Sequence, residues 1–248
     1  MISFRRPAAR LAAPILLCAA FAACGDAPTL PTSFAREAGG VTWVAVREPA
    51  GLPDARSWLP YLSADDAARV RRVQAAADAE RAAGRLETAL EMDAEARLSA
   101  ASLLAADPPP ARIRAALGAL EEWESRAAAR LETGRYPALE SVAAVVAARR
   151  AEAEAALARG ETRTAVLRLT EGAEAARSAS PVAVALRLVE AAEQRIDGDP
   201  SPSADLKRAR LLLRLSREAM ATGDQTRAMK RALYALQLID AEDARHRR

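Results

Sequence analysis

The sequence predicts an all-α protein of about eight antiparallel helices that form helical hairpins, stacked as a solenoid or gathered in an elongated bundle. The 248-residue chain is rich in alanine, leucine, glutamate and arginine, which favour helices, and only 4% of it is aromatic. Apolar residues recur with helical spacing, as in Val182, Leu186 and Val189. Isolated glycines and prolines separate these periodic segments, as expected at helix ends.

The first segment, residues 1–23, has the composition of a secretory signal peptide. Three arginines, at positions 5, 6 and 10, occur without any acidic residue, and an apolar run follows from Leu11 to Ala23. This run is shorter than the roughly 20 apolar residues that a membrane-spanning helix needs. We therefore expect export and removal of this segment.

The residues Phe21-Ala22-Ala23-Cys24-Gly25 close the apolar run. They resemble the lipobox of bacterial lipoprotein precursors, although that family usually has an aliphatic residue where Phe21 stands. The resemblance implies that Cys24 is acylated and becomes the new amino terminus. The alternative is an ordinary signal peptide cleaved after Ala20-Phe21-Ala22. Cys18 would be removed in either case, and a single unpaired thiol in an oxidising compartment favours lipidation of Cys24.

Charge and location follow from this processing. Without the arginines at positions 5, 6 and 10, the 36 basic residues fall to 33, which equals the number of acidic residues. A neutral mature chain gives no reason to expect nucleic acid as a partner. We expect a protein held on a membrane of the bacterial cell envelope by its N-terminal lipid and facing the periplasm, or, without lipidation, a secreted one.

Residues 24–62 are predicted to form a tether and a cap segment. Proline, glycine and serine are frequent here, and the only β-like stretch is VTWVAV at 41–46. Two tryptophans, Trp43 and Trp58, occur in this region. We expect them to anchor the cap against the helical body, and an exposed contact site is the alternative.

Residues 63–248 are predicted to form the helical hairpin domain. Ser63 stands three residues before Asp66, a variant of the capping box that opens a helix. Glycines at helix ends and prolines in first turns divide the domain into helices. The expected helices are 64–83, 86–106, 110–133, 137–159, 162–178, 181–197, 204–222 and 225–243. Connections this short predict that neighbouring helices run antiparallel.

Three of the hairpin turns share one pattern of small residues. Each turn has a glycine, with small residues seven positions before it and five and twelve positions after it: Ala77, Gly84, Ala89 and Ala96; Ala153, Gly160, Ala165 and Gly172; Ser216, Gly223, Ala228 and Ala235. This pattern resembles the tetratricopeptide repeat, and the resemblance implies a solenoid that binds peptides or proteins on its concave surface. A fourth turn at Gly134 departs from the pattern at Leu139 and Val146, and the glycines do not follow that family's 34-residue period.

The side chains needed for catalysis are scarce. His246 is the only histidine and lies in a terminal run expected to fray, so we expect neither histidine-based catalysis nor a histidine-ligated metal. No glycine-rich phosphate loop occurs, and no cofactor is expected. Acid pairs such as Glu91 and Glu95, or Glu121 and Glu122, are expected to form solvated, ion-paired helix faces.

Candidate interaction residues come from two features. Residues 204–231 carry eight basic and three acidic side chains, and four of the basic ones share one helix side, namely Lys207, Arg210, Arg214 and Arg217. This basic ridge could bind an acidic partner or anionic lipid head groups, or it could be a solvated outer face. Trp123 and Tyr136 are further candidates, because a partner-binding surface is expected to expose one of them.

The sequence therefore favours a lipid-anchored, non-catalytic scaffold or adaptor that binds another protein of the envelope. One alternative is a binding protein or a carboxylate-based enzyme that acts on a saccharide or peptide. Another is a passive structural lipoprotein.

Overall fold

The computed structural model describes residues 44–197 and 203–246, and this part of the chain is all-helical. A short helix α2 (Ala55–Trp58) and a 3₁₀ turn η2 (Leu59–Tyr61) come first. Eight long helices follow: α3 (Ala64–Ala82), α4 (Leu86–Ser102), α5 (Pro110–Leu131), α6 (Pro137–Ala158), α7 (Thr162–Ser178), α8 (Pro181–Asp197), α9 (Ala204–Ala221) and α10 (Gln225–His246). The predicted fold class is confirmed. Ser63 caps α3 as expected, with its Oγ accepting from the amide of Asp66.

Two helix ends differ from the prediction by three residues or more. Helix α4 stops at Ser102, because the amides of Ala105 and Ala106 donate to the carbonyl of Tyr61 and the prolines at 108–110 prevent a longer helix. Helix α10 continues to His246, three residues beyond the expected end at 243. The stretch expected to be β-like, 41–46, is extended from residue 44 onwards but forms no strand there, and its first three residues lie outside the described part.

Three hairpins, α3–α4, α6–α7 and α9–α10, end their first helix in the same way. Gly84, Gly160 and Gly223 have φ near +78°, a conformation that glycine adopts without steric cost. In each turn the amide after the glycine donates to a carbonyl five residues earlier at 2.9 Å, which is the Schellman motif: Arg85 to Glu80, Glu161 to Ala156 and Asp224 to Ala219.

The recurrent small residues lie where the helices of these hairpins meet. All nine are buried: Ala77, Ala89, Ala96, Ala153, Ala165, Gly172, Ser216, Ala228 and Ala235. A Cβ on Gly172 would lie 3.2 Å from Arg149 Cβ and from Leu120 Cδ1, so α7 approaches its neighbours closely there. Ser216 fits because its hydroxyl donates to the carbonyl of Ala228 across the α9–α10 interface.

The α5–α6 turn is built differently. Gly134 does not adopt a positive φ, and the large side chains of Leu139 and Val146 are buried where the other hairpins have small residues. Helices α5 and α6 consequently pack less extensively than the members of the three close hairpins. The departure seen in the sequence is thus a real difference in packing.

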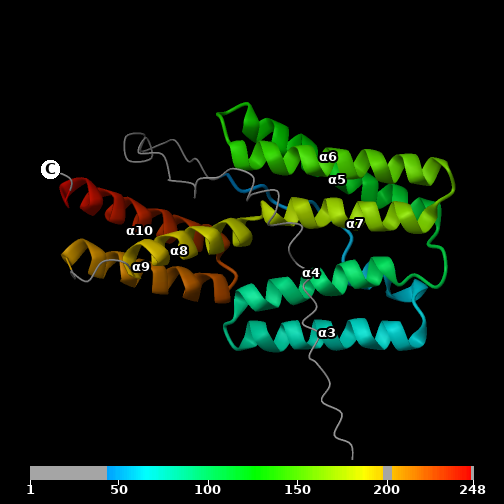
Figure 1. Ribbon diagram of the computed structural model, residues 1–248, viewed down its shortest axis with the longest axis horizontal. Coiled ribbons are helices and arrows are strands. Elements are labelled where there is room, and N and C mark those ends of the chain that lie inside the picture. The colour runs from blue at the N-terminus through cyan, green and yellow to red at the C-terminus, as the bar shows by residue number, and fades with distance from the viewer. Residues whose placement is uncertain (1–43, 198–202, 247–248) are drawn as a thin grey trace, which may run out of the picture.

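The helices form two units with separate hydrophobic cores. Helices α2 to α7 surround the larger core, which includes Ile113, Leu120 and Leu169. Helices α8 to α10 form a three-helix unit around Leu188, Leu213 and Leu236. Figure 1 shows this second unit projecting from one end of the first, with the C terminus at its far end.

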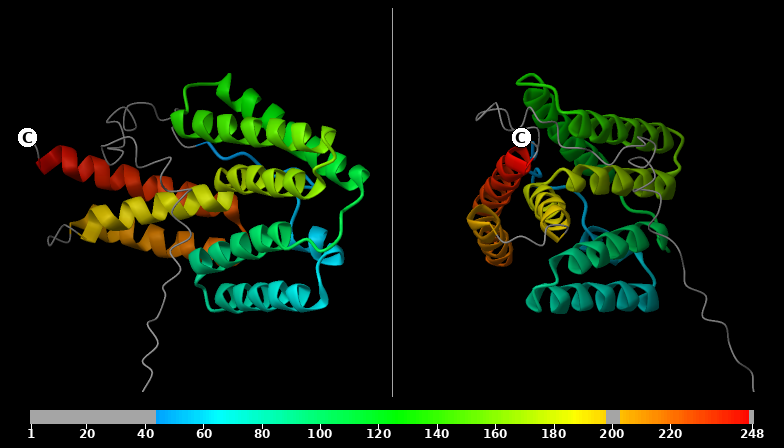
Figure 2. Two further views of the ribbon diagram at one scale, coloured as in Figure 1. Left: turned by 45° about the vertical axis from the view of Figure 1, so that its right-hand side comes forward. Right: turned by 60° about the vertical axis from the view of Figure 1, so that its left-hand side comes forward.

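The junction between α7 and α8 departs from the expected antiparallel order. Helix α8 leads away from α7 (Figures 1 and 2) and packs mainly on α9 and α10. The extended residues 44–46 lie at this junction, where the amide of Val46 donates to the carbonyl of Ala179. Val44 and Val46 pack against the larger core and Ala45 against the smaller one, so this stretch occupies the seam between the units.

Arginine side chains hold the segment 44–58, which we call the strap, on the helices. Arg126 of α5 donates to the carbonyls of Arg47 and Glu48, and Arg112 of the same helix donates to that of Ser57. Arg177 of α7 donates to the carbonyl of Pro53 at 2.7 Å. Trp58 ends the strap fully buried, and its Nε1 donates to Thr170 Oγ1 at 3.2 Å, which bears out the expected anchoring for this tryptophan.

Candidate interaction surfaces

The predicted lipid attachment site lies outside the described part of the chain. Cys24 and Trp43 both precede Val44, where the description begins. None of the described helices is long and apolar enough to cross a membrane. Acylation of Cys24 stays a prediction from the sequence.

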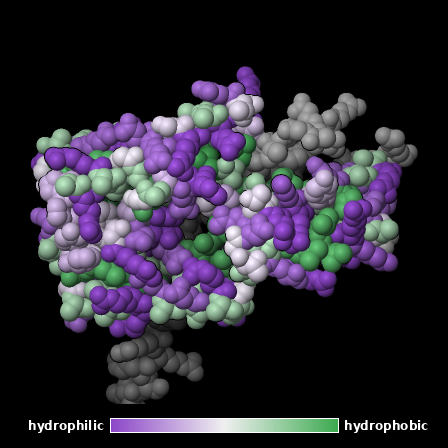
Figure 3. All heavy atoms as spheres, turned by 180° about the vertical axis from the view of Figure 1, so that it is seen from behind, coloured by the Kyte–Doolittle hydropathy of each residue, from purple (hydrophilic) through white to green (hydrophobic). Residues whose placement is uncertain are grey.

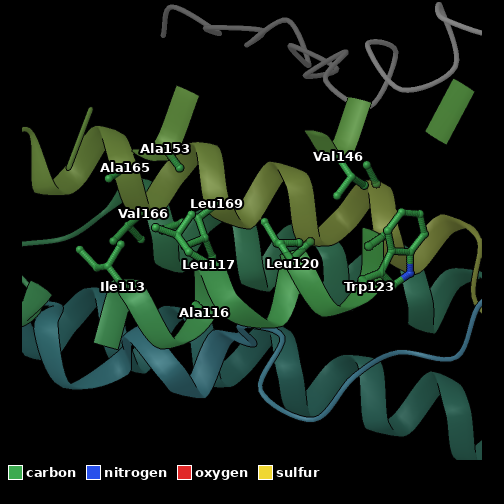
Figure 4. Packing of buried hydrophobic residues seen from close by; sticks show 14 of the residues in the cluster. Ile113, Ala116, Leu117, Leu120, Trp123, Val146, Ala153, Ala165, Val166 and Leu169 are labelled. Carbon is green, nitrogen blue, oxygen red and sulfur yellow. The ribbon is translucent and has the colours of Figure 1, made fainter. Parts of the chain in front are cut away.

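Trp123 is a core residue, and the expectation that it is exposed for a partner is wrong. Its side chain is 0% exposed. Figure 4 shows it on the same face of α5 as Leu120, turned toward the neighbouring helices and close to Val146. Helical spacing explains this, since Trp123 follows Ile113 and Leu120 on the buried stripe of α5.

Tyr136 is half-buried and immediately precedes the first residue of α6, next to the seam between the units. It lines a small crevice together with Val44, Leu139 and Val184. Its hydroxyl lies 3.4 Å from Thr133 Oγ1. Tyr136 is therefore part of the packing around the strap and offers little surface to a partner.

The basic ridge of α9 is exposed along its whole length. Arg217 is paired with Glu193 of α8 at 2.6 Å, and this hydrogen bond raises the pKa of Arg217. Arg214 and Glu218 form a long, solvent-exposed pair at 3.9 Å. Lys207 and Arg210 have no acidic partner among the described residues. The structure thus leaves all four exposed on α9, and Arg217 alone is joined to α8.

A second surface of the same hairpin was not expected from the sequence. Leu211 is 45% exposed and Tyr234 63% exposed, although both are large and apolar or aromatic. Arg231 of α10 donates to the carbonyl of Leu215, which indicates the register of this antiparallel pair and places residues 211–215 beside 231–235. Leu212, Leu215 and Leu238 are half-buried around these two side chains. We call these five residues the outer face. The sequence indicates it through the run LLLRL at 211–215, which has more apolar residues than one buried helix stripe can hold.

The carboxylate pairs considered from the sequence do not converge. Glu122 pairs with Arg126, and Glu124 pairs with Arg150, whose pKa is raised mainly by its hydrogen bond to Glu124. Glu91 and Glu95 are exposed on α4, and Arg97 of the same helix pairs with a residue of another helix. No group of three or more side chains suited to a metal ion occurs in the described ranges.

The partner of Arg97 is Glu174 of α7, the centre of a buried ion cluster. Arg97 donates through Nε and Nη2 to both carboxylate oxygens, at 2.5 and 2.9 Å. Arg177 donates to the same carboxylate at 2.7 Å and also lies 3.4 Å from Glu48 of the strap. The cluster ties α4, α7 and the strap together. Its central pair is separated by 77 residues, so no local sequence signal identifies it.

Comparison with known proteins gives no relative: no family model, no curated protein and no solved structure matches this chain. The tetratricopeptide resemblance therefore stays a prediction from the small-residue pattern of the three hairpins.

Proposed function

We propose that this chain is a lipoprotein of the bacterial cell envelope, attached to a membrane through Cys24, that acts as a non-catalytic scaffold for another protein. The three close hairpins support this proposal, because helix pairs of this kind present long, rigid surfaces. The lipobox-like sequence at 21–25 supports the attachment.

The observation that carries the proposal is the basic ridge. Lys207 and Arg210 are exposed on a helix that is fixed in the core by Leu206, Ala209 and Leu213. Surface cations that lack an acidic partner favour electrostatic steering of an acidic protein. The ridge is thus a rigid row of charge that a complementary surface can match.

The test is affinity capture with a ridge variant and a matched control. Residues 25–248 are immobilised and exposed to a detergent extract of the native envelope, and retained proteins are identified by mass spectrometry. The ridge variant carries Lys207→Glu, Arg210→Glu and Arg214→Glu. Arg217 is left in place because it joins α9 to Glu193 of α8. The control carries Arg69→Glu, Arg71→Glu and Arg72→Glu, three exposed arginines of α3.

We expect one protein to be retained by the native and control chains and lost from the ridge variant. Equal retention by the ridge variant, or retention of nothing above background, would contradict the scaffold. Attachment is tested separately from the mass of the mature N-terminal peptide, which should begin with an acylated Cys24. An unmodified N terminus at another residue would contradict the anchor alone.

A further inference from the structure

The outer face of the α9–α10 hairpin exposes apolar side chains. Two of the three large hydrophobic side chains exposed in the described ranges, Leu211 and Tyr234, are on this hairpin; the third is Val145 on α6. Figure 3 shows an apolar band across the C-terminal unit, seen from the side opposite to Figure 1. Helix α8 packs on the hairpin, yet these side chains remain exposed. An exposed apolar patch is typical of a site that contacts another protein or a membrane.

The charges beside the patch identify the chemistry of that occupant. Arg208 precedes Leu211 and Leu212 by three and four residues, and Lys230 precedes Tyr234 by four, so both cations border the outer face. Both are exposed, and neither has an acidic partner among the described residues. Asp205, three residues before Arg208, is paired with Arg245 of α10, and Asp224 is paired with Arg227 at 3.3 Å. A binding partner that matches this face therefore has apolar groups next to anionic ones.

We propose that the outer face binds the surface of an anionic lipid bilayer. Leu211 and Tyr234 stand out from the protein, so they can enter the boundary between head groups and acyl chains. Tyrosine favours this boundary because its ring is apolar and its hydroxyl is polar. Arg208 and Lys230 can reach outward to lipid phosphates while their aliphatic stems lie along the apolar side chains. An acidic protein would satisfy the same charges, and it is one of the outcomes of the test.

This inference does not rest on the scaffold proposal, because it is argued from Leu211, Tyr234, Arg208 and Lys230, none of which belongs to the ridge. The two surfaces adjoin at Leu211, which follows Lys207 by four residues and precedes Arg214 by three. A body attached through Cys24 would be connected by residues 25–43, which reach at most about 65 Å when extended. The bilayer would then always be close, and a weak patch would suffice to orient the body.

The first experiment measures binding of residues 25–248 to vesicles by co-sedimentation. Vesicles of phosphatidylcholine with one third phosphatidylglycerol are compared with pure phosphatidylcholine. We expect binding to the anionic vesicles alone, weakened by salt. Replacing Arg208 and Lys230 by serine should weaken it about 25-fold, taking about fivefold for each cation near an anionic surface. Replacing Leu211 and Tyr234 by serine should abolish it.

Matched controls come from α3 and α6. Arg71→Ser with Arg72→Ser removes two exposed cations, and Val145→Ser removes the third exposed hydrophobic side chain. Both controls should bind vesicles as the native chain does. Equal binding to the two kinds of vesicle, or an equal loss in the controls, would overturn the proposal.

A second readout locates the contact. Residues 25–248 contain no cysteine, so Tyr234→Cys and Val145→Cys can each be labelled with an environment-sensitive dye. We expect anionic vesicles to shift the emission of the dye at position 234 to shorter wavelength and to leave position 145 unchanged. No shift at 234, together with loss of a captured envelope protein in the Leu211→Ser, Tyr234→Ser variant, would overturn the lipid assignment and give this face to an acidic protein.

Discussion

Replacing Glu174 by glutamine should destabilise the larger unit more than any exposed carboxylate change. The Glu174 side chain is only 6% exposed, and the guanidinium groups of Arg97 and Arg177, at 14% and 15%, both bind it. Glutamine keeps the size and one acceptor but removes the negative charge. Arg177 retains Glu48 and the carbonyl of Pro53, whereas Arg97 is left without its carboxylate partner.

The magnitude follows from the burial of the cluster. Breaking a buried ion pair by removing one partner costs about 3–5 kcal/mol, because the remaining charge is neither solvated nor paired. For a chain of this size, that corresponds to a fall in Tm of about 6–20 °C. The matched control is Glu152→Gln on α6. Glu152 also pairs with two arginines, Arg149 and Arg168, but its side chain is 47% exposed, so its loss should cost at most about 1 kcal/mol.

The assay is urea and thermal unfolding of both variants, followed by far-ultraviolet circular dichroism. Because Glu174 and Glu152 lie in the same unit, both report on the same transition. A free energy of unfolding for Glu174→Gln within 1 kcal/mol of that for Glu152→Gln would refute the reasoning. It would mean that the cost of desolvating the Glu174 carboxylate equals the gain from its attraction to the two arginines, so that removing the charge changes the stability little.

The remaining predictions concern the turns and the strap, and each is checked by the same unfolding measurements. Gly84→Ala should lower the free energy of unfolding by about 1–2 kcal/mol through the positive φ alone, since an added Cβ there contacts nothing. Gly118→Ala within α5 should raise it by about 0.5–1 kcal/mol. Trp58→Phe should cost at least about 1 kcal/mol, because it removes the hydrogen bond to Thr170. Gly172→Ala should destabilise through the 3.2 Å approach of Leu120 Cδ1, and a neutral result would show that Leu120 can move aside.

Much of the fold was predictable because glycines and prolines mark the helix ends. The three Schellman turns repeat one small-residue pattern, and that pattern also identified the buried sides of α3, α6 and α9. Elsewhere alanine occupies both faces of the helices and hides which one is buried. Trp123 was expected at a surface because of its residue type alone, although its spacing from Leu120 places it in the core. Contacts between distant residues, such as Arg97 with Glu174, leave no periodic signal at all.

The strap gives the molecule a defined mechanical weak point. A pull on the chain from the N-terminal side of Val44 is delivered to the seam between the two cores. There it meets the hydrogen bond from the amide of Val46 to the carbonyl of Ala179. The arginine contacts at residues 47–48, 53 and 57 follow in order along the strap. Peeling would break these attachments one after another, each at a small force, and would loosen the two units from each other while every hairpin stays folded.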